Sequence, residues 1–245
     1  MNPFRRRIQT AMQQGGGAVA FNPTDIAGLQ LWLDASQIVG LNDGDAVGTW
    51  SDASGNGRNA TQATASKKPV FKTNVQNGKP VIRLDGVDDF MTTSFAYAAG
   101  AKTVFVVAKS ASVAGYTRAV SSIPDFGLYI GTDILNNNVS TFLGNSAGVW
   151  NDTSVNTPNA NWSTFKLVTL HTDNVTLTPY VNGTAQNTKN GATGALTGIQ
   201  IGTFDNGIYG QLWNGDVAEV ICYDSALSAG DLVQVTDYLA AKWGL

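Results

Sequence analysis

Short alternations of apolar and polar residues, rather than helical repeats, occupy most of the chain after Pro23. In LQLWLDA, from Leu29 to Ala35, leucine stands at every second position, which is the spacing of a β-strand with large residues on both faces. The same signal recurs in PVIRLDG, TVFVVAKS, FGLYIG, FKLVTLHT, VTLTPYVNG, GIQIG and DVAEVICYD, each bounded by Gly, Asn, Asp or Pro. The pattern predicts an all-β fold of short strands joined by tight turns.

The pattern also predicts two hairpin turns and one helix. Asp173-Asn174 lies between two predicted strands, and Asn182-Gly183 ends the second of them, so both pairs favour hairpin turns. Near the C-terminus, Ser228 with Asp231 three residues later predicts a capped helix start. The side chains expected to be buried on the apolar face of this helix are Leu232, Val235, Tyr238, Leu239 and Trp243.

The first 22 residues differ in charge from the rest of the chain. Arg5, Arg6 and Arg7 are three of the fifteen basic residues, and no acidic residue precedes Asp25. This segment therefore carries about +3 and the remainder about −6 of a net charge of −3. The expected units are an anchoring arm, residues 1–22, and one domain, residues 23–245.

Within the arm, Phe4, Ile8 and Met12 lie four residues apart and would form one stripe of a short helix, which the triglycine at 15–17 must end. Such a short helix is marginal alone in water, so we expect the arm to dock on another protein or on a symmetric copy. The residues expected to make that contact are Phe4, Arg5, Arg6, Arg7, Ile8 and Met12. The alternative is an arm that folds back on its own domain.

Composition narrows the class of protein. Charged residues make up only 13% of the chain, and no apolar run approaches the ~20 residues that span a bilayer. The N-terminus also lacks the apolar stretch of a secretory leader. Because the body of the chain is acidic, nucleic acid is an unlikely ligand on electrostatic grounds. The single cysteine, Cys222, lies in an apolar strand and is expected to be a small buried hydrophobe.

Five motifs follow one another in an order that resembles a known superfamily. They are IAGLQLWLDAS, WSDASGNGRNATQ, NGKPVIRLDGVDDFM, LVTLHTDNVTLTPYVNG and WNGDVAEVICYDSALSAGDLVQVTDYLAAKWGL. Together they extend over residues 24–245 and resemble the concanavalin A-like lectin/glucanase superfamily, in particular the laminin-G-like jelly rolls of bacterial surface proteins and bacteriophage virion proteins. The resemblance implies a jelly-roll sandwich of two antiparallel sheets, with the C-terminal helix against one edge or face. It implies no single function, because the superfamily includes lectins, glycosidases, polysaccharide lyases and structural modules.

The catalytic signatures of these relatives are missing from the sequence. Their glucanases use paired glutamates, whereas Glu219 is the only glutamate here, and Asp216 would point to the opposite face of a strand. Their lyases use a histidine with Tyr, Arg and Gln, but the only histidine, His171, stands beside a hairpin without an evident partner. No nucleophile elbow, zinc cluster or phosphate loop is present. We therefore predict a protein that is not an enzyme and has no catalytic residues, with an Asp-based carbohydrate-active site as the alternative.

Two segments have the composition of calcium loops. Asp52, Ser54, Asn56 and Gly57 follow the order of an EF-hand loop, but the twelfth position is Ala63, which offers no side-chain oxygen. A turn in which these side chains bond their own backbone explains the order better. In LDGVDDF, the acids Asp85, Asp88 and Asp89 could bind calcium as in some relatives, although Asp-Gly turns explain them too. No metal or other cofactor is therefore expected.

The segment NSAGVWNDTSVNTPNANW combines aromatic rings with Asn and Asp, as sugar sites of jelly-roll lectins do. The possible glycan-binding residues are Trp150, Asn151, Asp152 and Trp162. Trp162 directly precedes a predicted strand, so packing in the core is the stronger alternative for that residue.

These inferences lead to one expected function. The resemblance and the arm favour a lectin-like structural or binding protein displayed on a virion surface, as a capsid decoration, head fibre or tail component. Its expected partners are other virion proteins or symmetric copies, and cell-surface glycans. The alternatives are a carbohydrate-active enzyme, a glycosidase or lyase with a non-standard site, and a free-standing bacterial glycan-binding module.

Overall fold

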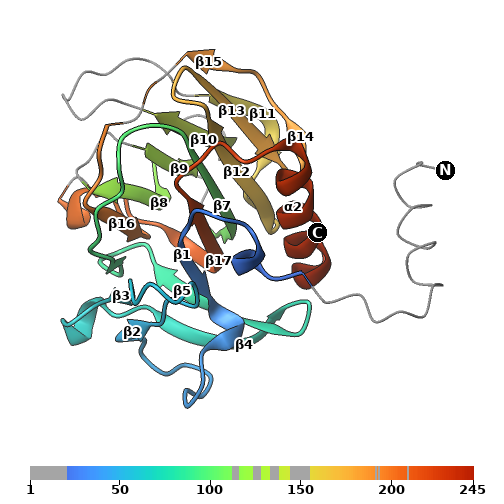
Figure 1. Ribbon diagram of the computed structural model, residues 1–245. Helices are drawn as coiled ribbons and strands as arrows, with labels where there is room; N and C mark the ends of the chain where they lie inside the picture. The colour runs from blue at the N-terminus through green and yellow to red at the C-terminus, as the bar shows by residue number, and fades with distance from the viewer. Residues whose placement is uncertain are drawn as a thin grey trace, which may run out of the picture.

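The structure is a computed structural model that describes residues 21–111, 116–123, 128–132, 138–143, 155–190, 192, 194–208 and 210–245. These residues form two antiparallel β-sheets, and a C-terminal helix, α2 (Ala229–Trp243), lies along one side of the sandwich (Figure 1). The predicted all-β, two-sheet sandwich with a C-terminal helix is confirmed.

Sheet A has the strand order β14, β13, β12, β7, β17, β5 and β4, with β1 also paired to β17 and β15 to β13. Its strands are β1 (Leu29–Asp34), β4 (Val70–Gln76), β5 (Lys79–Asp85), β7 (Lys102–Ser110), β12 (Lys166–Thr172), β13 (Thr176–Val181), β14 (Thr184–Ala185), β15 (Lys189–Asn190) and β17 (Asn214–Tyr223). One edge of β17 pairs along its length with β7, while the other pairs first with β5 and then with β1. Strand β17 is therefore the centre of this sheet.

Sheet B has the strand order β11, β10, β9, β8, β16, β6, β3 and β2. Its strands are β2 (Thr49–Trp50), β3 (Ala60–Thr61), β6 (Met91–Thr92), β8 (Arg118–Ile123), β9 (Leu128–Thr132), β10 (Asn138–Leu143), β11 (Val155–Asn161) and β16 (Gly198–Ile201). Single 3₁₀ turns connect strands at η1 (Pro23–Asp25), η2 (Ala35–Gln37), η3 (Ala65–Lys67) and η4 (Asp205–Gly207).

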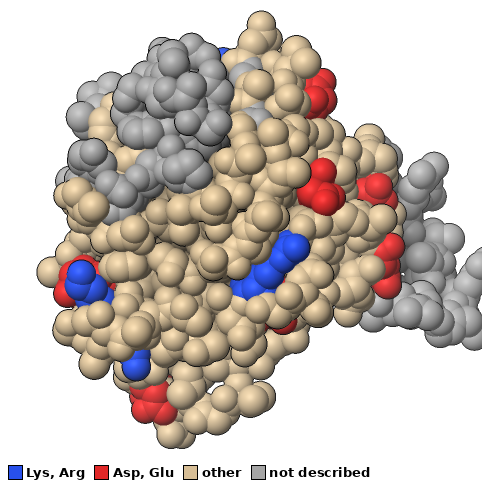
Figure 2. All heavy atoms as spheres, turned by 60° about the vertical axis from the view of Figure 1, so that its left-hand side comes forward, with Lys and Arg blue, Asp and Glu red and all other residues tan. Residues whose placement is uncertain are grey.

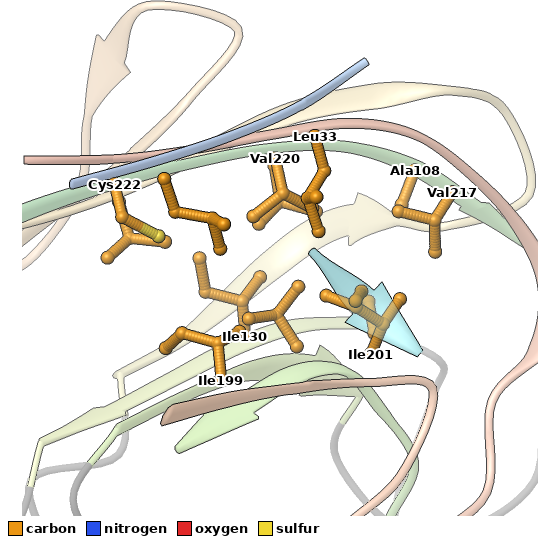
Figure 3. Packing of buried hydrophobic residues seen from close by; sticks show 14 of the residues in the cluster. Leu33, Ala108, Ile130, Ile199, Ile201, Val217, Val220 and Cys222 are labelled. Atoms are coloured by element: carbon orange, nitrogen blue, oxygen red, sulfur yellow. The ribbon is translucent and has the colours of Figure 1, made fainter. Parts of the chain in front are cut away.

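The main core lies between the two sheets. In Figure 3, apolar side chains of sheet A point toward those of sheet B across this layer. The labelled residues of sheet A are Leu33, Ala108, Val217, Val220 and Cys222, and those of sheet B are Ile130, Ile199 and Ile201. All of these side chains are fully buried, so the alternation in the sequence corresponds to one inward face on each sheet.

A second core lies between α2 and the outer face of sheet A. Phe105 and Val107 of β7 pack there with Leu239 and Trp243 of the helix. Because β7 has the main core on one face and this second core on the other, nearly all its residues are buried, and its central part, Val104 to Ala108, is continuously apolar. As predicted, Trp243 is fully buried, whereas Tyr238 is only partly buried.

The predicted helix start is confirmed at Ser228. Its hydroxyl oxygen accepts a hydrogen bond from the Asp231 main-chain N–H at 3.2 Å, which satisfies one of the free donors of the first turn. The Asp231 carboxylate accepts from the same hydroxyl instead of from the Ser228 main-chain N–H. Gly244 ends the helix with φ 69°, in the left-handed conformation common at helix C-termini.

Both predicted hairpins are present. Asn182 and Gly183, with φ 47° and 75°, join β13 to β14 between the paired residues Val181 and Thr184, as a two-residue hairpin requires. Between β12 and β13, the Asp173 carboxylate accepts from the main-chain N–H groups at 175 and 176. These turns fix the register of the sheet edge that carries β13.

The arm residues Phe4, Arg5, Arg6, Arg7, Ile8 and Met12 lie outside the described residues. Their docking role and the boundary at residue 22 therefore stay predictions. Among the helices that the structure describes, none combines the length and the hydropathy that a bilayer crossing requires.

Candidate functional site

The loop between β2 and β3 is organised by Asp52. The Asp52 carboxylate accepts hydrogen bonds from the main-chain N–H groups of Trp32 (3.0 Å), Ser54 (2.9 Å) and Arg58 (2.9 Å), and from the Ser54 hydroxyl (2.8 Å). The Asn56 amide donates to main-chain carbonyls of β1. Both carboxylate oxygens are thus occupied by the protein's own donors. This is the turn that we favoured over an EF-hand loop.

Beside this loop lies a hollow of about 390 Å³, lined by the segments 34–41 and 46–53 and called here the 34–53 hollow. Polar side chains at its surface are those of Gln37, Thr49 and Ser51, all exposed. Its apolar part includes Ile38, which packs against the main core, and Val39, which is 88% exposed. Sequence reasoning missed these residues, and their one local signal is an Ile-Val pair between polar turns.

Two carboxylates, Asp34 and Asp52, reach the same hollow. Asp34 accepts hydrogen bonds from the Ser36 N–H and hydroxyl and from the Gln37 amide, and it forms an ion pair with Lys242 at 2.5 Å. Because each oxygen of both acids already accepts from protein donors, these carboxylates shape the hollow and are not free bases.

The single glutamate, Glu219, anchors α2 to sheet A. One carboxylate oxygen accepts from the Trp32 indole (2.7 Å) and the Tyr238 hydroxyl (3.1 Å). The other accepts from the Trp243 indole (2.7 Å) and pairs with Lys242 (2.8 Å). Burial, followed by the nearby charge of Asp34, raises the pKa of Glu219, and the contacts with Lys242 and Trp243 oppose this shift. With both oxygens engaged beneath the helix, Glu219 has a structural role.

Two further reactive side chains are also held by the fold. His171 Nε2 lies 3.1 Å from the Leu227 carbonyl, and its ring meets Tyr180 edge-on at 6.3 Å. Cys222 is fully buried, and burial raises the pKa of its thiol. A buried thiol with a raised pKa is a poor nucleophile.

The acids Asp85, Asp88 and Asp89 form a cluster whose ligand atoms lie within 4.8 Å of one another. Asp85 also accepts the main-chain N–H of Val87 at 2.8 Å, as in an Asp-Gly turn. Burial, reinforced by the charges of Asp85 and Asp88, raises the pKa of Asp89 to about 6. Among the described residues this is the group with a spacing that fits a cation, although the turn accounts for the same geometry.

Of the four residues that the sequence suggested for glycan binding, the structure describes one, Trp162. Trp150, Asn151 and Asp152 lie outside the described residues. Trp162 is fully buried, its ring meets Trp213 edge-on at 5.2 Å, and its indole N–H donates to the Gly131 carbonyl at 2.8 Å. In this position Trp162 packs in the core and offers no platform for a sugar.

The face drawn in Figure 2 is largely uncharged, with Lys and Arg side chains isolated from one another. Where the structure describes this face, it carries no continuous basic surface of the kind that follows a phosphate backbone.

No protein-family model matches the chain, and no curated protein matches it by sequence. Its fold is similar to that of solved structures at low sequence identity. A Trypanosoma rangeli sialidase in complex with sialic acid aligns with a TM-score of 0.57 and 13% identity, over 93% of this chain and 35% of the sialidase. The binding domain of Paraclostridial Mosquitocidal Protein 1 aligns with a TM-score of 0.59 and 13% identity, over 89% of this chain and 53% of that domain. The binding domain of Botulinum Neurotoxin DC in complex with SialylT gives 0.54 and 13%, over 89% and 52% of the two chains.

The chain therefore spans about a third to a half of the length of these neighbours. At this level of identity the likeness establishes the sandwich fold. It also corrects one prediction. We predicted a protein that is not an enzyme, and that prediction is overturned because sialidases are among the structural neighbours. The missing glutamate pair, on which the prediction depended, is a signature of glucanases only and does not separate enzymes from binding proteins in this fold.

Proposed function

We propose that this protein is a glycan-binding β-sandwich and that the 34–53 hollow is its binding site. The observation that carries the proposal is the composition of the hollow, in which exposed hydroxyl and amide groups surround a small apolar surface. Sugars match this combination, because their hydroxyls form hydrogen bonds while their C–H faces bury apolar area. A hollow of about 390 Å³ has room for the end of an oligosaccharide chain.

The carboxylates of Asp34 and Asp52 support the proposal by holding the walls of the hollow. Asp34 fixes the Gln37 amide at 2.9 Å, and Asp52 ties the far wall to β1 through the Trp32 N–H. A site whose polar groups are fixed before binding loses less entropy when the ligand arrives.

The structural neighbours suggest which glycans to test first. The sialidase structure contains sialic acid, and the neurotoxin binding domain was solved with SialylT. Sialylated oligosaccharides are therefore the first probes for this chain, followed by neutral ones.

We propose further that the sandwich is displayed on a bacteriophage virion, with residues 1–22 attaching it to other virion proteins or to symmetric copies. The family resemblance and the basic arm support this part. Phe21, where the description begins, packs edge-on against Tyr238 of α2 at 5.7 Å, so the described end of the arm lies beside this helix. Asp237 is exposed there, in a hollow of about 570 Å³ that Lys242 also lines, and a carboxylate at this place favours a basic segment.

A glycan array followed by calorimetry on the best ligand tests the binding proposal. The variant Thr49→Ala/Ser51→Ala removes two hydroxyls from the hollow and should weaken binding about tenfold or more. Ser66→Ala, an exposed serine outside the hollow, is the matched control and should bind normally. Absence of binding to any glycan, or equal binding by both variants, would refute the site. Release of sugar from the same ligands, measured in parallel, would assign an enzymatic role.

Deletion of residues 1–17 tests the display proposal. The truncated chain should keep its melting temperature and glycan binding and lose incorporation into particles. Normal assembly of the truncated chain would show that the sandwich itself makes the contact.

A further inference from the structure

The outer face of sheet B is unusual because it is both polar and buried. The side chains that alternate with the core residues of β8, β9, β10 and β16 lie on this face. They are Arg118, Ser121, Tyr129, Ser140 and Gln200, each no more than 5% exposed. A buried sheet face is ordinarily apolar, because burying polar groups costs free energy unless each finds a partner.

Residues 203–208 cover part of this face. The Ser121 hydroxyl donates to the Thr203 carbonyl at 2.7 Å, and the Asn206 N–H donates to the Gln200 side-chain oxygen at 2.9 Å. Asn206 and Gly207 have φ of 53° and 85°, so the segment turns sharply just beyond its contact with the sheet. Two polar groups of the face are thus satisfied by the covering segment.

Arg118 is not satisfied in the same way. It is 2% exposed, yet its Nε has no hydrogen-bond partner. Its Nη1 reaches the Thr117 and Thr132 carbonyls only at 3.3 Å each, which is long for a hydrogen bond. Over the described part of the chain, no carboxylate forms an ion pair with it. The charge is therefore buried without a counter-charge among these residues, and burial lowers the pKa of Arg118.

Aromatic rings surround the guanidinium instead. Its carbon lies 3.6 Å from the ring centre of Tyr129, 5.5 Å from that of Tyr116 and 5.9 Å from that of Phe204. Cation–π contacts offset part of the cost of burying the charge, but they leave the in-plane Nε–H donor unused. In a guanidinium this N–H belongs to the planar fork that matches a carboxylate.

A buried acceptor lies close by along the backbone. The Arg118 N–H donates to the Gln211 carbonyl at 3.2 Å, and the side-chain oxygen of Gln211 is buried without a partner. Sheet B and the segment hydrogen-bonded to it thus hold an unused donor on Arg118 and an unused acceptor on Gln211. A ligand that carries both a carboxylate and hydroxyl groups would satisfy both.

We propose that Arg118 is the carboxylate-binding residue of a second ligand site on the outer face of sheet B, and that its ligand is a sugar acid, such as a uronic or sialic acid. The guanidinium binds the carboxylate, and the aromatic side chains pack against the sugar ring. The inference rests on the proposed function only in taking a glycan as the ligand, because the site is separate from the 34–53 hollow.

Tyr116 is the entrance to this site. Its ring centre lies 5.5 Å from the guanidinium carbon and its side chain is 46% exposed, so a ligand reaches Arg118 by displacing this side chain. The site is closed in the absence of ligand. The guanidinium is thus shielded from water until an anion binds to it.

Calorimetry with glucuronate, galacturonate and N-acetylneuraminate, each compared with its uncharged methyl ester, tests the proposal on the unmodified chain. The acids should bind, and the esters should bind at least about 30-fold more weakly, because the charge-assisted pair is lost. Arg118→Met should lose acid binding to a similar extent and keep or raise the melting temperature, since it removes an uncompensated buried charge. Lys166→Met removes a partly buried cation on sheet A whose ammonium donates to the Thr164 hydroxyl, and it is the matched control.

If Arg118→Met does not fold, the NMR signal of the Arg118 side-chain Nε–H in the unmodified chain decides the question, and it should shift on addition of the acid and not of the ester. Equal binding of acid and ester, undiminished binding by Arg118→Met, or an unchanged Nε–H signal would overturn the proposal. Binding of neutral glycans alone would overturn this inference and leave the proposed function standing. Binding of free sugar acids at Arg118, with no response on the glycan array from the 34–53 hollow, would support this site and reject the hollow.

Discussion

Removal of the negative charge of Glu219 should have the largest effect on stability of any conservative substitution in the second core. Glu219→Gln preserves the shape of the side chain, so packing of α2 on sheet A is unchanged. The amide offers one oxygen where the carboxylate offers two. If that oxygen keeps the Trp32 indole and the Tyr238 hydroxyl, the amide N–H₂ faces the Trp243 indole N–H and the Lys242 ammonium, and donors then oppose donors.

The structure sets the size of this effect. Two hydrogen bonds to a charged acceptor are lost, each contributing about 1.5–3 kcal/mol. The expected destabilisation is about 3–5 kcal/mol, the range for breaking one side of a buried ion pair. This is a large share of the ~5–15 kcal/mol by which a folded protein is stable.

Urea unfolding at pH 8, followed by tryptophan fluorescence and circular dichroism, measures the change. Because the pKa of Glu219 is raised by burial, an alkaline pH favours its ionised form. Lys242→Met should cost a comparable amount, because it leaves Asp34 and Glu219 buried without their cation. The double variant should cost less than the sum of the two, since both changes break one network. A loss below about 1 kcal/mol for Glu219→Gln, or strict additivity in the double variant, would refute the anchoring role.

Three further predictions concern other parts of the fold. A strong chelator should leave the melting temperature unchanged, because Asp52 is bound by the protein's own donors, and a loss of several degrees restored by calcium would contradict this. The pKa of Asp89 is about 6 in the folded protein, above its unfolded value. Its contribution to the free energy of unfolding is therefore complete below pH ~4 and is lost as the pH rises through 6, a change of up to about 3 kcal/mol. Asp89→Asn should remove this dependence in unfolding curves measured from pH 4 to 7, and an unchanged profile would exclude Asp89 as its source. Gly131→Ala should lower the free energy of unfolding by about 3 kcal/mol or more, because the new Cβ would lie 2.0 Å from the Thr117 carbonyl oxygen, and a neutral effect in thermal unfolding would show that β8 and β9 separate easily.

The parts of the fold that the sequence predicted are those with a local signal. Strand β13 alternates between partly buried and buried positions, as its sequence alternates, and Asn182-Gly183 defines its turn. Among the strands longer than two residues, the sequence did not predict β4, β8, β10 and β11. Strand β11, VNTPNAN, is an edge strand in which polar residues and a proline predominate, so it lacks the regular apolar alternation of the predicted strands. Strand β8, RAVSSI, carries polar residues on its outer face that are buried only because other segments cover them.

The candidate sites depended still less on local signals. Glu219 gains its partners from β1 and α2, between 19 and 187 positions away along the chain, and a sequence window around it shows only a lone acid in a strand. Arg118 gives no signal at all in RAVSSI. Its significance depends on burial, on the missing counter-charge among the described residues and on rings from three segments, and each of these is a property of the folded chain.

The two outer faces of the sandwich differ in chemical character. Where α2 packs on the outer face of sheet A, the contact is an apolar core closed by Trp243. The outer face of sheet B is buried as well, but its side chains are polar and one of them is charged. Apolar residues of similar volume would make such a face more stable, and marginally stable proteins retain costly groups mainly where function requires them. The free-energy cost of burying the Arg118 guanidinium is thus the physical reason to look for a ligand on that face. A carboxylate bound to the guanidinium would compensate the buried charge with a strong, charge-assisted contact.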